Sequence, residues 1–282
     1  MRPSIVIALI AAVLAVTAPA ALADATNSSN WAGYAVHKPG VSFHTVTGTW
    51  RQPNAKCTPG VQTYSAFWVG LGGFSLSAPA LEQTGTEVDC SISGKVVSTA
   101  WYELVPAASV PIKLAVHPGD LMRASVTVTG SQVAIRLDDV TRHSGFKKTL
   151  DAGVIDVSSA EWIAEAPSQC VSIDSCQTLP LADFAPTKFD SATVRSSTGH
   201  FGSISDRTWG WTKIRLTPGG RRFAAYKGNG PASGAAAPSS LLPGGRSFSV
   251  SWALASAQGN PFVQDRRAAA AAAVRAGGAL YH

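Results

Sequence analysis

From Phe43 to Leu254 the sequence is a succession of short segments with alternating side chains, separated by turn-forming residues. In Phe43–Trp50 every second residue from Thr45 to Thr49 is threonine. A period of two places successive side chains on opposite faces of a β-strand. The other segments that we interpret as strands are Tyr64–Leu71, Leu81–Val88, Val96–Val105, Leu121–Thr129, Gln132–Val140, Ser158–Pro167, Leu181–Phe184, Ser191–Arg195, Thr208–Leu216, Arg222–Tyr226 and Phe248–Leu254.

Many short strands with regular turn signals predict an all-β fold, and we expect a two-sheet antiparallel β-sandwich. The dipeptide Gly130-Ser131 between two of the segments predicts a two-residue hairpin turn. The stretch Gly228–Gly245 is rich in Gly, Pro, Ala and Ser, which favours a long surface loop. A helical period is found only in Ala268–Val274.

The two ends of the chain differ from the strand-rich middle. Residues 1–23 contain an early arginine, an apolar run and the small-residue site Ala21-Leu22-Ala23, which is the plan of a cleaved secretory signal peptide. The apolar run is shorter than the roughly 20 residues of a membrane helix, so we expect no membrane anchor. We expect one β-sandwich domain at 24–265, and a flexible Ala-rich tail at 266–282. The protein is thus expected to be secreted.

Charge argues against nucleic acid as a partner. The formal net charge is +6, but only 14% of the residues are charged. The basic pairs at 147–148, 221–222 and 266–267 lie far apart and form no basic stripe.

The four cysteines, at 57, 90, 170 and 176, have the spacing of neither a zinc site nor a redox motif. In an oxidising compartment they favour two disulfides. Three pairings are possible, and spacing alone does not decide between them. We expect Cys57–Cys90, joining two neighbouring loops, and Cys170–Cys176, closing a tight loop.

The segment Ser158–Pro167 carries the most informative carboxylate. Alternation places Ser159, Glu161, Ile163 and Glu165 on one face. Among apolar neighbours a carboxylate is costly unless it is paired or used in chemistry. The alternative is that Glu161 lies on the solvent face of a half-exposed sheet.

Common hydrolase motifs are absent, including G-x-S-x-G, H-E-x-x-H and D-[ST]-G. The six histidines show no ligand spacing, so we expect no metal and no cofactor. Gln83, in the segment Leu81–Val88, is an unusual polar residue directly before Thr-Gly. If Gln83 and Glu161 lie on neighbouring strands, the carboxylate can activate a water and the amide can stabilise an oxyanion.

Five motifs follow one another between about Ser29 and Phe184. They are Asn30-Trp31-Ala32-Gly33, Trp68-Val69-Gly70, Gln83-Thr84-Gly85, Ala100-Trp101-Tyr102-Glu103 and Ala160-Glu161-Trp162-Ile163. In these motifs and their order the chain resembles the glutamic peptidases, also called eqolisins, which are secreted acid endopeptidases with a concanavalin-like β-sandwich. The chain departs from the family pattern at Gly72 and Glu87, where Asp is usual. Its pI of about 9.3 also contrasts with acidic fungal members.

The resemblance implies a catalytic dyad of Gln83 and Glu161 and protein or peptide substrates, cleaved at acidic pH by what we expect to be a monomer. It makes Trp68, Trp101, Glu103 and Glu87 candidates for binding substrate. The alternatives are that Gln83 is a polar residue on a wet strand face, that the two tryptophans are core residues, and that Glu103 is solvated.

Glu165 lies about 13 Å along the strand from Glu161, too far for a close carboxylate pair, and we interpret it as structural.

Two other classes remain open. A glycosidase on the same architecture would pair Glu161 with Glu103 or Glu87, because it needs two carboxylates about 5–9.5 Å apart. A non-catalytic carbohydrate-binding sandwich would instead use the tryptophans to stack on sugars. A glycosidase would not need Gln83, and a binding module would need neither member of the dyad.

Overall fold

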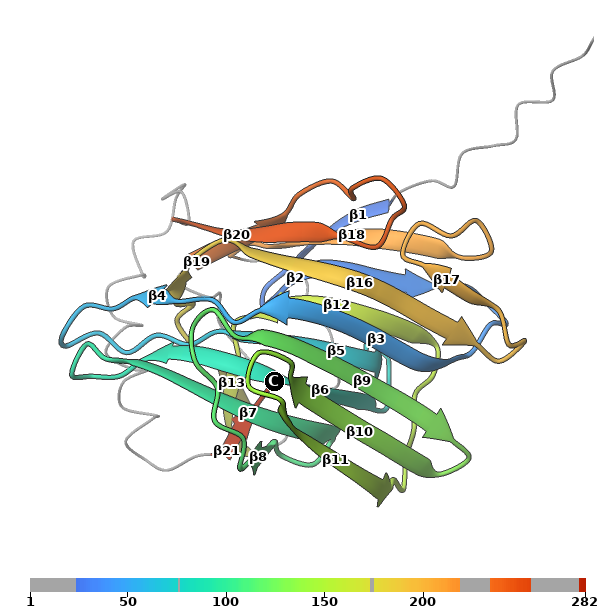
Figure 1. The fold of residues 1–282 in the computed structure, drawn as a ribbon, viewed down its shortest axis with the longest axis horizontal. Coiled ribbons are helices and arrows are strands. Elements are labelled where there is room, and N and C mark those ends of the chain that lie inside the picture. Colours follow the sequence, from blue (N-terminus) through green and yellow to red (C-terminus); the bar gives the residue numbers. More distant parts are fainter. Residues whose placement is uncertain (1–23, 76, 173–174, 219–233, 255–278) are drawn as a thin grey trace, which may run out of the picture.

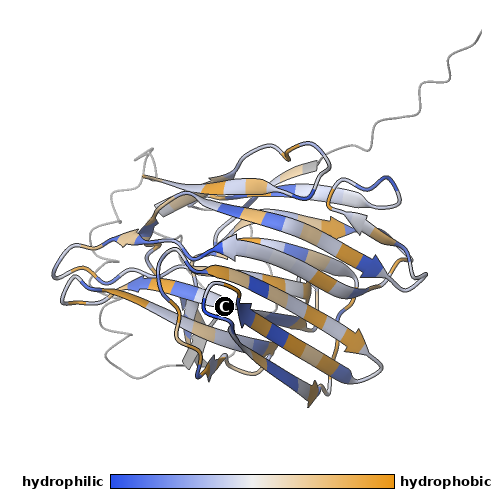
Figure 2. Cartoon of the chain, in the orientation of Figure 1, coloured by the Kyte–Doolittle hydropathy of each residue, from blue (hydrophilic) through white to orange (hydrophobic). Residues whose placement is uncertain are grey.

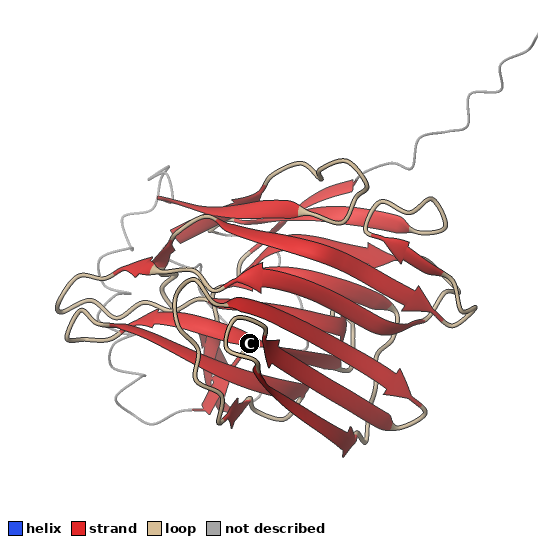
Figure 3. Ribbon diagram, in the orientation of Figure 1, coloured by secondary structure: helices blue, strands red, loops and turns tan. Residues whose placement is uncertain are grey.

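The structure is a computed structural model that describes residues 24–75, 77–172, 175–218, 234–254 and 279–282. Within these residues all regular secondary structure is β-strand, and no helix is found (Figure 3). One long antiparallel sheet folds over, so that its two halves pack against each other as two layers (Figure 1).

Layer 1 has the strand order β11–β10–β9–β3–β16–β20. Its strands are β3 (Phe43–Arg51), β9 (Leu121–Thr129), β10 (Gln132–Asp139), β11 (Ser144–Asp151), β16 (Thr187–Ser196) and β20 (Phe248–Leu254).

Layer 2 has the order β18–β2–β12–β5–β6–β7–β8. Its strands are β2 (Trp31–His37), β5 (Ala66–Gly72), β6 (Leu81–Cys90), β7 (Val96–Val105), β8 (Val110–Ile112), β12 (Ser159–Glu165) and β18 (Gly210–Leu216). The short strand β19 (Gly234–Pro238) pairs with β20 and with β18, and thereby joins the two layers at one edge.

Smaller strands complete the fold. In layer 2, β1 (Asp24–Ser28) runs parallel to β18; in layer 1, β17 (Phe201–Ser203) pairs with β16. A two-stranded sheet joins β4 (Ala55–Lys56) to β15 (Asp183–Phe184). A three-stranded sheet consists of β13 (Ser168–Ser172), β14 (Ser175–Thr178) and β21 (Ala279–Tyr281).

The main core lies between the layers. Along β10, buried residues alternate with more exposed ones. Figure 2 shows hydrophobic and hydrophilic residues following one another along the strands of this layer. Two buried indoles link the layers by hydrogen bonds. Trp162 Nε1 donates to the Thr47 carbonyl oxygen at 2.7 Å, and Trp50 Nε1 donates to Thr86 Oγ1 at 3.0 Å. Buried polar groups are thus paired where the layers meet.

Layer 2 differs from layer 1 because the middle of it is buried on both faces. Every residue of β5 and of β12 is buried. The even-numbered residues of β12, such as Trp162, face layer 1, so the odd-numbered ones face away from it. We call this outer surface of β12, β5, β6 and β7 the site face.

Most of the predicted strands are confirmed, among them 96–105 and 121–129, and the Gly130-Ser131 hairpin turn is confirmed by the pairing of Thr129 with Gln132. The loop expected at 228–245 is wrong for Gly234–Pro238, which form β19. The predicted strand 181–184 is shortened to Asp183–Phe184. The segments 222–226 and 268–274 lie outside the described residues.

The structure joins Cys57 to Cys90 and Cys170 to Cys176. The second disulfide bridges β13 and β14, where Cys170 and Cys176 are register partners. The described part of the chain contains no helix with the length and apolarity of a membrane span.

Candidate active site

The strand that carries Glu161 lies inside layer 2, between β2 and β5. Its side chain lies on the site face and is 0% exposed, so the alternative of a solvent-exposed strand carboxylate is wrong. The register then continues across the sheet: Glu161 pairs with Gly70, Gly70 with Gln83, and Gln83 with Glu103. These four residues form one row on the site face.

Gln83 and Glu161 are not on neighbouring strands, as the sequence interpretation supposed, because β5 lies between β12 and β6. Two strand spacings separate their backbones by about 10 Å. The residue of β5 in this row is Gly70, which adds no side chain between them. A Cβ at Gly70 would lie 3.0 Å from the Leu81 side chain, 3.0 Å from the Trp68 ring and 3.2 Å from Gln83 Cβ.

The carboxyl group of Glu161 is fully buried. Burial raises the pKa of Glu161 well above its ordinary value. The Ser159 hydroxyl on the same face opposes the rise, and the carboxyl groups of Asp156 and Glu82 add to it. The group is therefore a strong proton acceptor once it is ionised.

Glu82 and Asp156 form a second acidic pair beside Glu161, which the sequence interpretation missed. The Asp156 backbone N–H donates to Glu82 Oε1 at 3.3 Å. Burial raises the pKa of Glu82 to about 8. Below about pH 8 Glu82 therefore binds a proton and contributes no charge to the site.

The amide of Gln83 is oriented by its neighbours. Its Nε2 donates to Glu103 Oε2 at 2.7 Å and to the backbone oxygen of His282 at 3.0 Å. A carboxylate can only accept, so the contact with Glu103 determines which end of the amide carries the N–H groups. One N–H is thus held by Glu103, and the other is directed at the backbone oxygen of His282.

A second row on the site face contains Glu165, Ala66, Glu87 and Thr99. Thr99 Oγ1 donates to Glu87 Oε2 at 2.5 Å, and His282 Nε2 lies 3.1 Å from Glu87 Oε1. Burial alone would raise the pKa of Glu87, but the imidazole of His282 and the Thr99 hydroxyl lower it below its ordinary value.

Between the two rows lie the aromatic residues of the site. Ile163, Trp68, Gly85 and Trp101 form the middle row. A Cβ at Gly85 would lie 2.6 Å from Trp68 Cβ, so the glycine leaves room for that tryptophan. The Trp68 ring meets Trp31 edge-on, with their centroids 5.0 Å apart.

Glu165 belongs to the same surface, although the sequence interpretation assigned it a purely structural place. Its carboxyl oxygens accept hydrogen bonds from Asn30 Nδ2 at 2.9 Å and from Trp68 Nε1 at 2.7 Å. Burial raises the pKa of Glu165 to about 7, and the nearby imidazole of His282 opposes the rise.

The structure thus brings together all six residues predicted for the site. The composition contained a signal for the two glutamates that were not predicted for the site, Glu82 and Glu165. The sequence has only five glutamates, and each is buried in β6, β7 or β12. They are Glu82, Glu87, Glu103, Glu161 and Glu165.

The largest departure from the sequence interpretation concerns the last four residues. A flexible tail was expected at 266–282, yet 279–281 form β21, and His282 is 2% exposed on the site face. Its imidazole stacks on Trp101 with ring centroids 4.0 Å apart. Residues 266–278 lie outside the described part of the chain.

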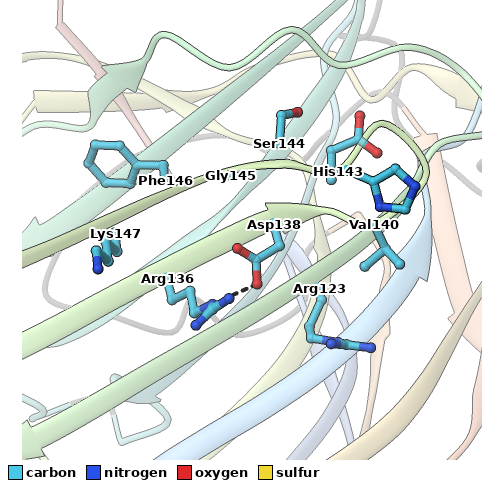
Figure 4. A pocket seen from close by; sticks show the side chains of 10 residues that line it. Arg123, Arg136, Asp138, Val140, His143, Ser144, Gly145, Phe146 and Lys147 are labelled. Carbon is cyan, nitrogen blue, oxygen red and sulfur yellow. Dashed lines mark hydrogen bonds and ion pairs between the residues drawn. The ribbon is translucent and has the colours of Figure 1, made fainter.

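In the described residues no cluster of three or more His, Cys, Asp or Glu side chains could hold a metal ion. A surface groove of about 480 Å³ lies elsewhere, over layer 1, and is lined by residues such as Arg123, Arg136, Asp138 and Lys147 (Figure 4). It contains none of the residues predicted for the site.

Chemically, the first row provides a carboxyl group that can accept a proton and an amide N–H that can stabilise an oxyanion. The two residues lie on strands on opposite sides of β5, which has a glycine at that point. This is an arrangement for activating water against a carbonyl group without a metal ion or a nucleophilic side chain.

Comparisons with known proteins give a family and a fold for the chain. The model of the Peptidase A4 family matches residues 29–215. A solved structure of scytalido-glutamic peptidase with a peptide-based transition-state analogue is 23% identical, with a TM-score of 0.62, and the match covers 79% of this chain and 98% of that one.

A solved structure of SCP-B, a member of the eqolisin family, in complex with the tripeptide Ala-Ile-His is 21% identical, with a TM-score of 0.58 and the same coverage of both chains. At these identities the likeness shows the fold, and it confirms the predicted β-sandwich class. No curated protein matches the chain.

Proposed function

Because the chain belongs to the Peptidase A4 family and is therefore a glutamic endopeptidase, we propose that Glu161 and Gln83 are its catalytic dyad. The observation that carries the proposal is their shared row on the site face, with Gly70 between them. The peptide ligands of the two solved neighbours support a peptide as the molecule bound at this face. The family excludes the glycosidase and the carbohydrate-binding alternatives.

In the proposed reaction Glu161, ionised, takes a proton from a water as the water oxygen attacks the scissile carbonyl carbon. The resulting oxyanion accepts a hydrogen bond from Gln83 Nε2. Glu161 then returns the proton to the leaving nitrogen as the C–N bond breaks, and the products are a carboxylic acid and an amine. The raised pKa of Glu161 makes it suitable for both proton transfers.

Glu103 acts as a positioning residue. Its hydrogen bond to Gln83 Nε2 turns the amide so that the second N–H is available to the substrate. Trp68, Trp101 and Glu87 form the surface against which the peptide lies, and Glu165 fixes Trp68 through the indole N–H.

The working conditions follow from the carboxyl groups. Only the ionised form of Glu161 can accept a proton from water, so activity falls as pH falls through its raised pKa. The family resemblance favours activity on the acidic side of neutrality, and the raised pKa of Glu161 puts the acid limit higher than an ordinary glutamate would give. The signal-like residues 1–23 and the two disulfides support secretion, and we propose a monomer.

The test is digestion of a denatured protein at pH 3–7, with peptide products detected by mass spectrometry. The native chain should produce peptides, and the Glu161→Gln variant should be slower by about 100- to 10,000-fold, the usual contribution of a general base. Asp206→Asn, a partly buried carboxylate that lies 3.0 Å from His200 Nε2, is the matched control.

Chelators, fluorophosphonates, thiol reagents and pepstatin should leave the native chain active. Near-native turnover by a correctly folded Glu161→Gln variant would remove Glu161 from the mechanism.

A further inference from the structure

The segment 279–282 lies on the site face in the manner of a bound peptide. Strand β21 pairs antiparallel with β13, so that Ser168 lies opposite Tyr281 and Cys170 opposite Ala279 (Figure 1). Addition of a strand to an exposed sheet edge is a common way for proteins to bind extended peptides. The disulfide between β13 and β14 braces that edge.

The backbone of His282 then uses the polar groups that the proposed reaction requires. Its backbone oxygen accepts from Gln83 Nε2 at 3.0 Å, and its N–H donates to Glu103 Oε2 at 3.2 Å. Because His282 is the last residue, this oxygen belongs to a carboxylate, and it lies where the proposed mechanism puts the carboxyl group of the acyl product.

The side chain of His282 is equally specific in its contacts. The ring stacks on Trp101 at an interplanar angle of 18°, and Nε2 lies 3.1 Å from Glu87 Oε1. The charged groups that face it come from three strands: Glu87 from β6, Glu103 from β7 and Glu165 from β12, with Asp89 and Tyr64 beyond Glu87. Three carboxyl groups, one from each of these strands, thus lie around the last residue.

We propose that residues 279–282 are an intramolecular peptide ligand of the active site, which excludes substrate until the segment is displaced. The proposal rests on the function proposed above for Gln83 and Glu161. Backbone pairing with β13, the contact with Gln83 and the stacked imidazole all compete directly with a peptide substrate. Displacement of this segment from the site face is thus the step that would activate the enzyme.

The first experiment compares the full chain with a chain that stops after Gly278, on a short peptide substrate. A ligand tethered to its own site has a local concentration of millimolar order, so truncation should raise kcat/KM by about tenfold or more. The synthetic tetrapeptide Ala-Leu-Tyr-His should inhibit the truncated chain competitively, and Ala-Leu-Tyr-Ala should be at least about tenfold weaker. His200→Ala, which changes an exposed histidine bound to Asp206, is the control and should leave kcat/KM unchanged.

The second experiment measures binding without catalysis, so that it separates this proposal from the proposed function. Tetrapeptide binding to Glu161→Gln forms of both chains is followed by calorimetry and by tryptophan fluorescence. The truncated form should bind Ala-Leu-Tyr-His, and the full chain should bind it at least about tenfold more weakly. If the truncated chain does not fold, His282→Ala in the full chain takes its place and should also bind the peptide more tightly than the native chain.

Equal binding by the full and shortened chains, or no binding by a folded shortened chain, would overturn the proposal. Binding that follows the expected pattern in a protein without peptidase activity would leave this inference standing and reject the proposed reaction.

Discussion

Glu161 and Gln83 lie in one row across layer 2, with a single strand between them. In that row the intervening strand has Gly70, and the Nε2 of Gln83 is already directed at the backbone oxygen of His282. The relationship depends on the consecutive strands β5 and β6 and on the distant strand β12, and each of them offers a separate way to disturb the chemistry.

Gln83→Ala should lower kcat by about 100- to 1,000-fold and leave KM within a few-fold, because the amide stabilises the oxyanion more than the bound substrate. Gln132→Ala, an exposed glutamine at the start of β10, is the control. Steady-state kinetics on one peptide measure both constants. A large rise in KM with an unchanged kcat would instead make Gln83 a residue that only holds the substrate.

Gly70→Ala should lower kcat/KM while the fold is retained, because the new methyl group would lie 3.0 Å from Trp68 and 3.2 Å from Gln83 Cβ. A displacement of about 1 Å in a catalytic group can reduce the rate about 100-fold. Gly153→Ala is the control, since a Cβ there would meet nothing within 4 Å. An unchanged kcat/KM in Gly70→Ala would show that the reaction does not depend on the space over Gly70.

Asp156→Asn should move the acid limb of the kcat/KM profile to lower pH. Burial is the main reason that the pKa of Glu161 is high, and the negative charge of Asp156 adds to it. Removal of that charge lowers the pKa of Glu161, so the base stays ionised in more acidic solution. Asp138→Asn in the groove over layer 1 should leave the profile unchanged; an equal shift in that control would assign the effect to net charge.

Glu161→Gln should change the pH dependence of stability. A carboxyl group with a raised pKa in the folded state favours folding fully below its unfolded pKa, and this contribution is lost as pH rises through the folded pKa. Each pKa unit corresponds to about 1.4 kcal/mol.

Urea unfolding of both proteins at several pH values tests this prediction. The variant should gain stability relative to the native chain as pH rises from 4 to 8. A difference that does not change with pH would mean that Glu161 is hydrated in the folded state.

Strands could be predicted from alternating side chains wherever one face of the strand is buried and the other is exposed to solvent, as in β9 and β10. This prediction failed for β2, whose first six residues are all buried, and for the edge strand β11, which has no buried residue and therefore no alternation. The strand β19 was missed because Gly234-Ala235-Ala236-Ala237-Pro238 has the composition of a loop.

For the site, the motifs predicted which residues act, and not their spatial order. The order of strands in a sheet depends on pairing between distant segments, and a local sequence pattern carries no information on that pairing. The position of β5 between the strands of Glu161 and Gln83 was therefore not expected. The role of His282 could not be foreseen for the same reason. A tetrapeptide has no periodicity, and its contact with Gln83 spans 199 positions in the sequence.

The two ends of the long sheet are edges at which another strand could add. Apart from the branches β1 and β17, the described strand order ends at β11 on one side and at β8 on the other, and β19 pairs with one strand of each layer. The exposed strand β11 carries Lys147 and Lys148, and β8 is three residues long with Pro111 at its centre.

Lysine repels a second edge, and proline lacks the N–H that a new strand would need. The fold can therefore keep one edge open to a peptide, at β13, while edge-to-edge aggregation of whole molecules is suppressed.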